Sequence, residues 1–169
     1  MRVYLIGMMG SGKSTVGRKL ALRLGYEYYD LDEQMEESSG RTISEMFEED
    51  GEEAFRFFES MAMKNIAMLD NLVLATGGGA PCFHDSMKLM KRTGPTIYLK
   101  ADINFLASRL VQSEGRPLID GLSGDALKKK LEELMTERKP YYEKAKFTVD
   151  AMNVGSTEIE DIVKMIGKR

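Results

Sequence analysis

The sequence lacks long hydrophobic runs, a strong excess of one charge and more than one cysteine. None of its apolar runs approaches the roughly 20 residues that a membrane-spanning helix needs. Its 24 basic and 27 acidic residues give a net charge of −3, whereas nucleic-acid-binding domains are usually clearly basic. The single cysteine, Cys82, cannot form an internal disulfide, which suits a reducing cytosol. We therefore expect a cytoplasmic protein that binds neither nucleic acid nor a membrane.

The chain also lacks internal repeats and low-complexity segments, and its start is unlike a secretory leader. A strand pattern begins at Val3–Ile6, where a leader would carry a charged and then an apolar region, so we expect no leader. The apolar fraction of 43% is sufficient for a hydrophobic core, and 169 residues fit one domain. We expect a single domain over residues 1–169.

Short apolar runs alternate with longer amphipathic stretches. The expected strands are Val3–Ile6, Tyr28–Tyr29, Leu72–Ala75, Thr96–Leu99 and Phe147–Val149. The expected helices are Lys13–Leu24, 32–69 in pieces interrupted at Gly40 and Gly51, 84–92, 102–111, 125–144 and 156–166. This alternation predicts an α/β fold of three layers, with helices on both faces of a parallel sheet. Ligands of such sheets bind beyond the carboxyl ends of the strands, which directs attention to residues 7–14, 30–32 and 76–79.

A phosphate-binding pattern follows the first expected strand. It reads Gly7-Met8-Met9-Gly10-Ser11-Gly12-Lys13-Ser14-Thr15 and matches G-x-x-x-x-G-K-[ST], the P-loop. Glycines allow a tight turn whose N–H groups face phosphate oxygens, and the helix that follows adds its positive N-terminal end. Lys13 can bridge the outer phosphates and the Ser14 hydroxyl can bind Mg²⁺. The pattern occurs in kinases, GTPases and ATPases alike, but no T-K-x-D motif is present, which disfavours a GTPase.

An acidic pair, Asp30 and Asp32, follows the second expected strand. If the chain remains extended through Asp32, both carboxylates lie on one side. One can then hold the water shell of a metal ion, and the other can accept a proton from an attacking hydroxyl. Alternatively, the pair caps the helix that follows. The spacing alone leaves both interpretations open.

Three arginines and a glycine run are further candidates for substrate contacts. Arg56 lies among phenylalanines that cannot all face one core, although it can also be an exposed arginine paired with a glutamate. Arg138 lies near a helix end, where a cation also suits the helix dipole. Arg116 belongs to the segment 112–124, which is rich in glycine and which we expect to be a mobile lid. The run Gly77–Gly79 leaves a bare backbone that a ligand can approach.

These segments together resemble the shikimate kinases, over nearly the whole chain from Val3 to about Asp150. The resemblance rests on six segments in this order: residues 7–15, Asp30-Leu31-Asp32, Gly51-x-x-x-Phe55-Arg56-x-x-Glu59, Gly77-Gly78-Gly79-Ala80, Arg116-Pro117-Leu118 and Arg138-x-Pro140-x-Tyr142. The resemblance implies a fold like that of nucleoside monophosphate kinases, with strand order 2-3-1-4-5. It also implies a substrate-binding subdomain at about 32–60, a lid at about 112–124, and a monomer.

The resemblance further implies that ATP phosphorylates the 3-hydroxyl of shikimate, a step toward chorismate and the aromatic amino acids. ATP would bind to Gly10, Ser11, Gly12, Lys13, Ser14, Thr15, Arg109 and Arg116, with Arg109 near adenine. Shikimate would bind to Asp32, Phe47, Phe55, Arg56, Gly78, Gly79 and Arg138. Asp32 would act as the base, Lys13 and Arg116 would stabilise the transferred phosphoryl group, and Mg²⁺ would bind Ser14 directly and Asp30 through water. Residues 152–156 read Met-Asn-Val-Gly-Ser where the family often has Asn-Pro, so we assign no adenine contacts there.

Two alternatives remain open at this point. The chain can be another kinase of this fold, for a substrate such as gluconate or a nucleotide, since gluconate also has a carboxylate and hydroxyls. It can also be a P-loop protein that binds a nucleotide without turnover and acts as a regulator or scaffold. The glycine run and the context of Arg56 favour shikimate. The intact Lys13, Ser14, Asp32 and Arg116 favour an enzyme.

Overall fold

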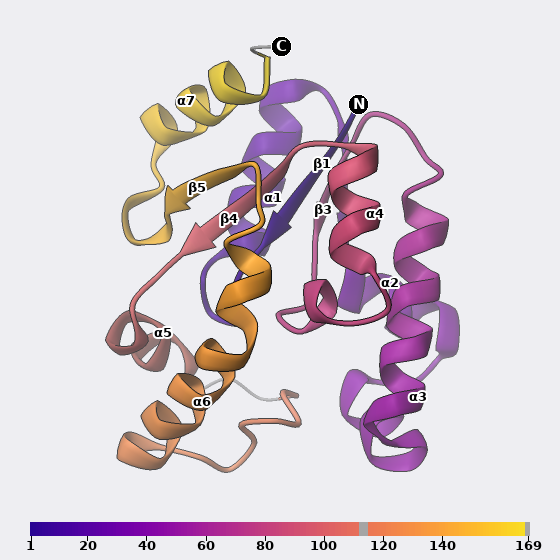
Figure 1. The fold of residues 1–169 in the computed structure, drawn as a ribbon, viewed down its shortest axis with the longest axis vertical. Helices are drawn as coiled ribbons and strands as arrows, with labels where there is room; N and C mark the ends of the chain where they lie inside the picture. The colour runs from indigo at the N-terminus through magenta and orange to yellow at the C-terminus, as the bar shows by residue number, and fades with distance from the viewer. Residues whose placement is uncertain (112–114, 168–169) are drawn as a thin grey trace.

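A computed structural model describes residues 1–111 and 115–167, which form a five-stranded parallel sheet with helices on both faces (Figure 1). The strands are β1 (Arg2–Ile6), β2 (Glu27–Asp30), β3 (Leu72–Ala75), β4 (Thr96–Lys100) and β5 (Phe147–Asp150). Their order is β2-β3-β1-β4-β5, and each neighbouring pair is parallel. The five predicted strands and the order implied by the resemblance are confirmed.

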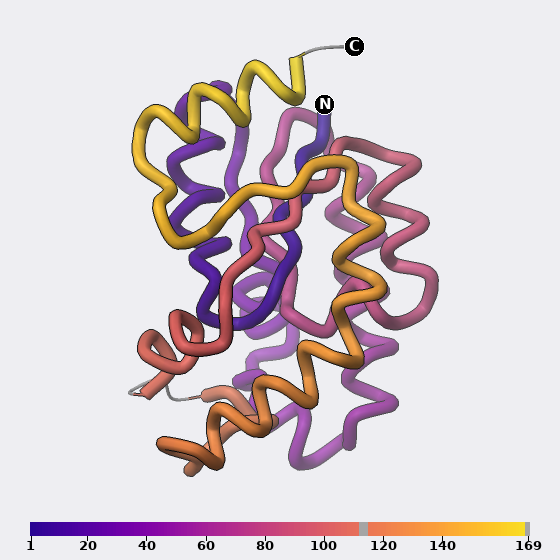
Figure 2. Tube along the Cα trace, turned by 60° about the vertical axis from the view of Figure 1, so that its left-hand side comes forward, coloured from indigo at the N-terminus to yellow at the C-terminus, as the bar shows by residue number. Residues whose placement is uncertain are grey.

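The helices form the two outer layers. They are α1 (Lys13–Leu24), α2 (Leu31–Ser39), α3 (Ile43–Ile66), α4 (Ser86–Thr93), α5 (Ile103–Leu110), α6 (Gly124–Tyr142) and α7 (Ser156–Gly167), with the 3-10 turns η1 (Ala80–Cys82) and η2 (Ala151–Asn153). α1 and α7 pack together on one face of the sheet, and α4 and α6 cover the opposite face (Figure 2). Each predicted helical segment is present, with ends that differ by a few residues.

The central strands form the middle of the core. Val3–Ile6 of β1 and Leu72–Ala75 of β3 are buried along their whole length. A central parallel strand is covered on both faces, so its sequence is a continuous apolar run and does not alternate. The register pairs Val3 with Val73 and Leu5 with Ala75, which brings the ends of β1 and β3 to the same edge of the sheet.

Two glycines divide the segment after β2, as the sequence predicts. Gly40 ends α2 with φ 68°, and Gly51 interrupts α3 with φ 81°. Both values lie in the left-handed region that favours glycine. Between them, Thr42 and Glu45 form a reciprocal capping box that begins α3. The interruptions let α2 and the first part of α3 pack on each other beyond the carboxyl end of the sheet, beside the candidate site.

Within residues 1–111 and 115–167, no helix combines the length and the apolar character that crossing a bilayer requires.

Candidate active site

Two adjoining cavities lie beyond the carboxyl ends of the strands. The phosphate-loop cavity is lined by Met9, Gly10, Gly12, Lys13, Ser14, Thr15, Asp30, Asp32, Thr76, Gly77, Gly78, Arg109 and Arg116. The arginine cavity is lined by Met9, Asp32, Ile43, Phe47, Phe55, Arg56, Glu59, Gly77, Gly78, Gly79, Gly115, Arg116, Pro117, Leu118 and Arg138. The two cavities share Met9, Asp32, Gly77, Gly78 and Arg116. A group bound in one cavity therefore faces a group bound in the other across the same few residues.

The loop between β1 and α1 has the backbone that its glycines predict. Gly7 has φ 142°, and a Cβ there would lie 2.6 Å from the Leu99 carbonyl oxygen. Gly12, with φ 89°, is the residue from which α1 begins. The loop therefore lies directly at the N-terminus of a 12-residue helix, where N–H groups without helical partners favour an anion.

Lys13 is buried in this loop. Its Nζ donates hydrogen bonds to the carbonyl oxygens of Gly7 (2.9 Å) and Met8 (2.8 Å). Burial, and then the positive charge of Arg116, lower the pKa of Lys13 to about 8. The amine is still mainly charged at neutral pH, and the carbonyl oxygens hold it against the loop.

Ser14 and Asp30 form an oxygen pair beside the loop. The Ser14 hydroxyl donates to Asp30 Oδ2 at 2.8 Å, and both residues line the phosphate-loop cavity. Oxygen atoms of this kind are the donors that Mg²⁺ prefers, and Mg²⁺ usually takes only one or two protein ligands beside phosphate oxygens and water. No cluster of three or more histidine, cysteine or carboxylate ligands occurs in the described parts of the chain. The donor set therefore fits Mg²⁺ bound together with a nucleotide.

Of the two interpretations that the spacing of Asp30 and Asp32 leaves open, the structure shows the helix cap, and the chain does not remain extended through Asp32. Asp30 ends β2 and caps α2, because its Oδ1 accepts a hydrogen bond from the Asp32 N–H at 3.1 Å. The chain becomes helical immediately after Asp30, so strand alternation does not govern Asp32. A cap at Asp30 is compatible with a role of the pair in binding a metal ion and accepting a proton, since both carboxylates line the phosphate-loop cavity.

Asp32 lies where the two cavities meet. Removal from water, and then the charge of Asp30, raise the pKa of Asp32 to about 6, although Lys13 and Arg116 act in the opposite direction. At neutral pH the carboxylate is mainly ionised and more basic than an ordinary aspartate. These are the properties of a group suited to take a proton from a hydroxyl.

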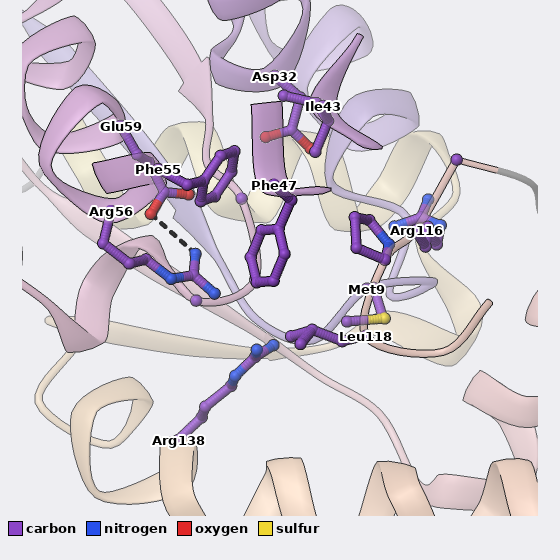
Figure 3. A pocket seen from close by; sticks show the side chains of 15 residues that line it. Met9, Asp32, Ile43, Phe47, Phe55, Arg56, Glu59, Arg116, Leu118 and Arg138 are labelled. Carbon is purple, nitrogen blue, oxygen red and sulfur yellow. Dashed lines mark hydrogen bonds and ion pairs between the residues drawn. The ribbon is translucent and has the colours of Figure 1, made fainter. Parts of the chain in front are cut away.

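Arg56 enters the arginine cavity from α3 and is buried, with 5% of its surface exposed. Its Nη1 donates to Glu59 Oε2 at 2.9 Å, the dashed line in Figure 3, and its Nε and Nη2 lie 3.3 Å from Glu52 Oε1. The helical pairing with glutamates that the sequence allows is present, but the arginine is not exposed. The neighbouring Phe57 faces solvent, as expected for a helix that cannot bury all its phenylalanines.

Arg138 enters the same cavity from α6 and is 4% exposed. Its Nη1 is buried and has no hydrogen-bond partner among the residues that the structure describes. A buried donor without a partner costs free energy, so its presence beside a cavity indicates a ligand that accepts the bond. Arg56 and Arg138 both point toward the space around Phe47 from separate helices (Figure 3).

The remaining lining of the arginine cavity is apolar or bare backbone. Phe47 and Phe55, on either side of the break at Gly51, lie with ring centroids 5.2 Å apart. Gly78 and Gly79 follow β3 as predicted. A Cβ on Gly79 would lie 2.5 Å from Arg56 Nη2, so the guanidinium packs directly on the glycine backbone.

The segment expected to be a lid contributes to both cavities. Arg116 lines both, and Leu118 lines the arginine cavity. Ile119 is buried and anchors the segment in the core. Residues 112–114 of the predicted lid lie outside the described residues.

Arg109 of α5 lines the phosphate-loop cavity and places its guanidinium over the Phe105 ring.

The sequence assigned no role to Met9 or Ile43, and it allowed Glu59 only as a possible partner of an exposed Arg56. Met9 lines both cavities, Ile43 lines the arginine cavity, and Glu59 is the buried partner of Arg56. The spacing of Glu59, three residues after Arg56, was a signal for this pair. For Met9 and Ile43 the sequence shows only apolar residues, which are far more often part of a core.

Comparison with known proteins agrees with this geometry. A family model described as shikimate kinase matches residues 9–167. The chain belongs to the shikimate kinase family. The shikimate kinase of Parabacteroides distasonis is 40% identical over 169 residues, which cover 99% of this chain and 98% of that protein.

Solved structures of shikimate kinases have the same fold. The enzyme from Bacteroides thetaiotaomicron is 36% identical, with a TM-score of 0.89 over 98% of this chain and 95% of that one. The shikimate kinase of Acinetobacter baumannii in complex with shikimate is 35% identical, with a TM-score of 0.90 over 98% and 92% of the two chains. A deoxyadenosine kinase from M. mycoides, at 19% identity and a TM-score of 0.64, shares the fold alone.

Proposed function

We propose that this chain transfers the γ-phosphoryl group of ATP to the 3-hydroxyl group of shikimate, giving shikimate 3-phosphate and ADP. The observation that carries the proposal is the shared wall between the cavities. A pocket with two arginines and apolar walls adjoins a phosphate-binding loop, and Asp32 and Arg116 lie at the junction. Membership of the shikimate kinase family supports this substrate, as does the relative solved in complex with shikimate.

ATP binds along the phosphate loop in this proposal. The N–H groups of Gly10–Thr15 and the start of α1 hold the phosphates, and Arg109 lies toward the adenosine. Lys13 and Arg116 are both cations on the phosphate-loop cavity, and they stabilise the charge of the transferred group. Arg116 also lines the acceptor side, so it can contact the phosphoryl group throughout the transfer.

The Ser14 hydroxyl would hold the Mg²⁺ that accompanies ATP, and Asp30 would act on it through water. When bound, it neutralises part of the phosphate charge. Asp30 also caps α2, which fixes its carboxylate beside Ser14.

Shikimate lies in the arginine cavity. Arg56 and Arg138 bind its carboxylate, because a guanidinium fork matches two carboxylate oxygens. Phe47 and Phe55 contact the apolar part of the ring, and the bare backbone of Gly78 and Gly79 permits close approach. The unpaired Nη1 of Arg138 finds an acceptor in this arrangement.

Asp32 binds the ring hydroxyls and acts as the base. It accepts the proton of the 3-hydroxyl as the oxygen forms its bond to the γ-phosphorus. The bond between that phosphorus and the bridging oxygen of ADP breaks, and ADP retains the electron pair.

Residues 112–124 act as the lid that excludes water, and residues 32–60 as the substrate-binding subdomain. One chain lines both cavities, which supports an active monomer, and we propose a cytoplasmic location because the family's activity needs no membrane.

The identity of the product tests this proposal. The protein is incubated with Mg·ATP and shikimate, and the product is analysed by ³¹P and ¹H NMR. A single phosphate ester at the 3-position is expected, and gluconate and nucleoside monophosphates should remain unchanged. Phosphorylation of gluconate or of a nucleotide, with shikimate unchanged, would contradict the substrate assignment.

A further inference from the structure

The backbone of Gly77–Gly79, which we call the glycine platform, packs against four ionisable side chains of the site. A Cβ on Gly77 would lie 2.7 Å from Glu59 Oε1 and 3.1 Å from Asp32 Oδ1. A Cβ on Gly78 would lie 3.0 Å from Arg138 Nη1, and Gly79 packs on the Arg56 guanidinium. The platform therefore lies in close contact with the carboxylate at the cavity junction and with both arginines.

A side chain outside both cavities holds the platform. Tyr142, at the end of α6, donates its hydroxyl hydrogen bond to the Gly78 carbonyl oxygen at 2.5 Å. Among the residues that the structure describes, this is the only hydrogen bond from a side chain to Gly77, Gly78 or Gly79. Neither cavity is lined by Tyr142, which is completely buried.

The position of Tyr142 connects several parts of the site. It lies four residues after Arg138 on the same helix, so one turn of α6 carries both the arginine and the support of the platform beneath it. Its hydroxyl also lies 3.6 Å from Met8 Sδ in the phosphate loop. Its ring packs on Tyr98 of β4, with centroids 5.1 Å apart. Burial raises the pKa of Tyr142, so the hydroxyl remains a donor across the working pH range.

We infer that Tyr142 is a positioning residue for the acceptor pocket: its hydrogen bond to Gly78 fixes the glycine platform and, through it, the distance between Asp32 and the arginine pair. Its side chain lines neither cavity, so it acts through Gly78. This inference rests on the proposed function, because it concerns the binding of shikimate.

The variant Tyr142→Phe tests the inference. It retains the ring that packs on Tyr98 and removes the hydroxyl, with its short hydrogen bond to Gly78 and its longer contact to Met8 Sδ. Losing one buried hydrogen bond should weaken shikimate binding by about tenfold or more. Tyr98→Phe is the matched control, since within residues 1–111 and 115–167 the Tyr98 hydroxyl has only a long contact of 3.8 Å to Met135 Sδ. Titration calorimetry with shikimate and with Mg·ATP measures each affinity, and a urea titration measures the free energy of unfolding.

The expected result is a loss of shikimate affinity in Tyr142→Phe, with Mg·ATP affinity changed by less than about twofold and Tyr98→Phe like the wild type. A purely structural role would weaken both ligands together or change stability alone, and that result would overturn the inference. Unchanged shikimate affinity would also overturn it. If the wild-type protein itself does not bind shikimate, the proposed function fails, which is a distinguishable result.

Discussion

At the scale of single residues, Asp32 combines a raised pKa with a position at the junction of the two cavities. We expect Asp32→Asn to lower kcat by about 10²-fold or more, because an amide cannot accept the proton of the acceptor hydroxyl. The affinity for Mg·ATP should change little, since the phosphate loop is intact. Steady-state kinetics and ATP titration measure the two effects. A variant with near-normal turnover would exclude Asp32 as the base.

Arg56 is the second residue with a separable role. Arg56→Lys keeps a positive charge beside Glu59 but loses the planar fork that matches a carboxylate. We expect the KM for shikimate to rise by about tenfold or more, with little change in the KM for ATP. Arg18→Lys is the control, because Arg18 pairs with Glu33 on the exposed surface. If both variants bind shikimate like the wild type, Arg56 does not contact the carboxylate.

The sequence singled out Arg56, Arg138 and Asp32 because an arginine or an aspartate in a recognisable motif suggests a chemical role. All three line the arginine cavity, and their roles remain predictions. The burial of the Arg56–Glu59 pair could not be predicted from spacing, since the same spacing occurs on exposed helices. The role that we infer for Tyr142 depends on a contact between residues 64 positions apart, which no local pattern contains.

At the scale of elements, the turn after β3 places bare backbone against charged side chains. Gly79→Ala should displace the Arg56 guanidinium, because the new methyl group would lie 2.5 to 2.7 Å from it. The φ angle of Gly79 is −86°, so the substitution causes no backbone strain of its own. We expect a rise of about tenfold in the KM for shikimate and an unchanged affinity for Mg·ATP.

The matched control for this variant is Gly167→Ala, near the end of α7, where a Cβ would meet nothing within 4 Å. It should bind both substrates like the wild type. An alanine at position 79 that left shikimate binding unchanged would show that Arg56 can move without consequence.

Element positions were the most predictable part of the fold. Gly40 and Gly51 were predicted as interruptions because glycine favours positive φ, and both interrupt helices in the structure. The boundary at Asp30 was predicted less well. The sequence allowed either an extended chain or a cap, and only the hydrogen bond from the Asp32 N–H to the Asp30 side chain decides for the cap.

At the scale of the whole molecule, we expect the ionised Asp32 carboxylate to lower the free energy of unfolding at neutral and higher pH. The pKa of Asp32 is raised to about 6 from 3.8, so the folded protein binds this proton more tightly than the unfolded chain. The stabilisation from the protonated form is complete below about pH 4 and is lost as the pH rises through 6. In Asp32→Asn the amide does not ionise, so this decrease in the free energy of unfolding with rising pH is absent. At pH 8 the variant should be more stable than the wild type by on the order of 1 to 2 kcal/mol, and at pH 4 by much less.

Urea unfolding at both pH values measures this difference. Glu33→Gln, one position along α2 and exposed, is the control that should show little change at either pH. If Asp32→Asn and the wild type are equally stable at pH 8, the pKa of Asp32 is not raised in the folded protein.

The central claim is that shikimate accepts the phosphoryl group of ATP in this site. The most direct test is the initial rate of ADP release in a coupled assay with Mg·ATP, measured with and without shikimate. The proposed function predicts a slow rate without shikimate and a large, saturable increase with it. A rate that shikimate does not change, in a protein that binds ATP, would contradict the claim.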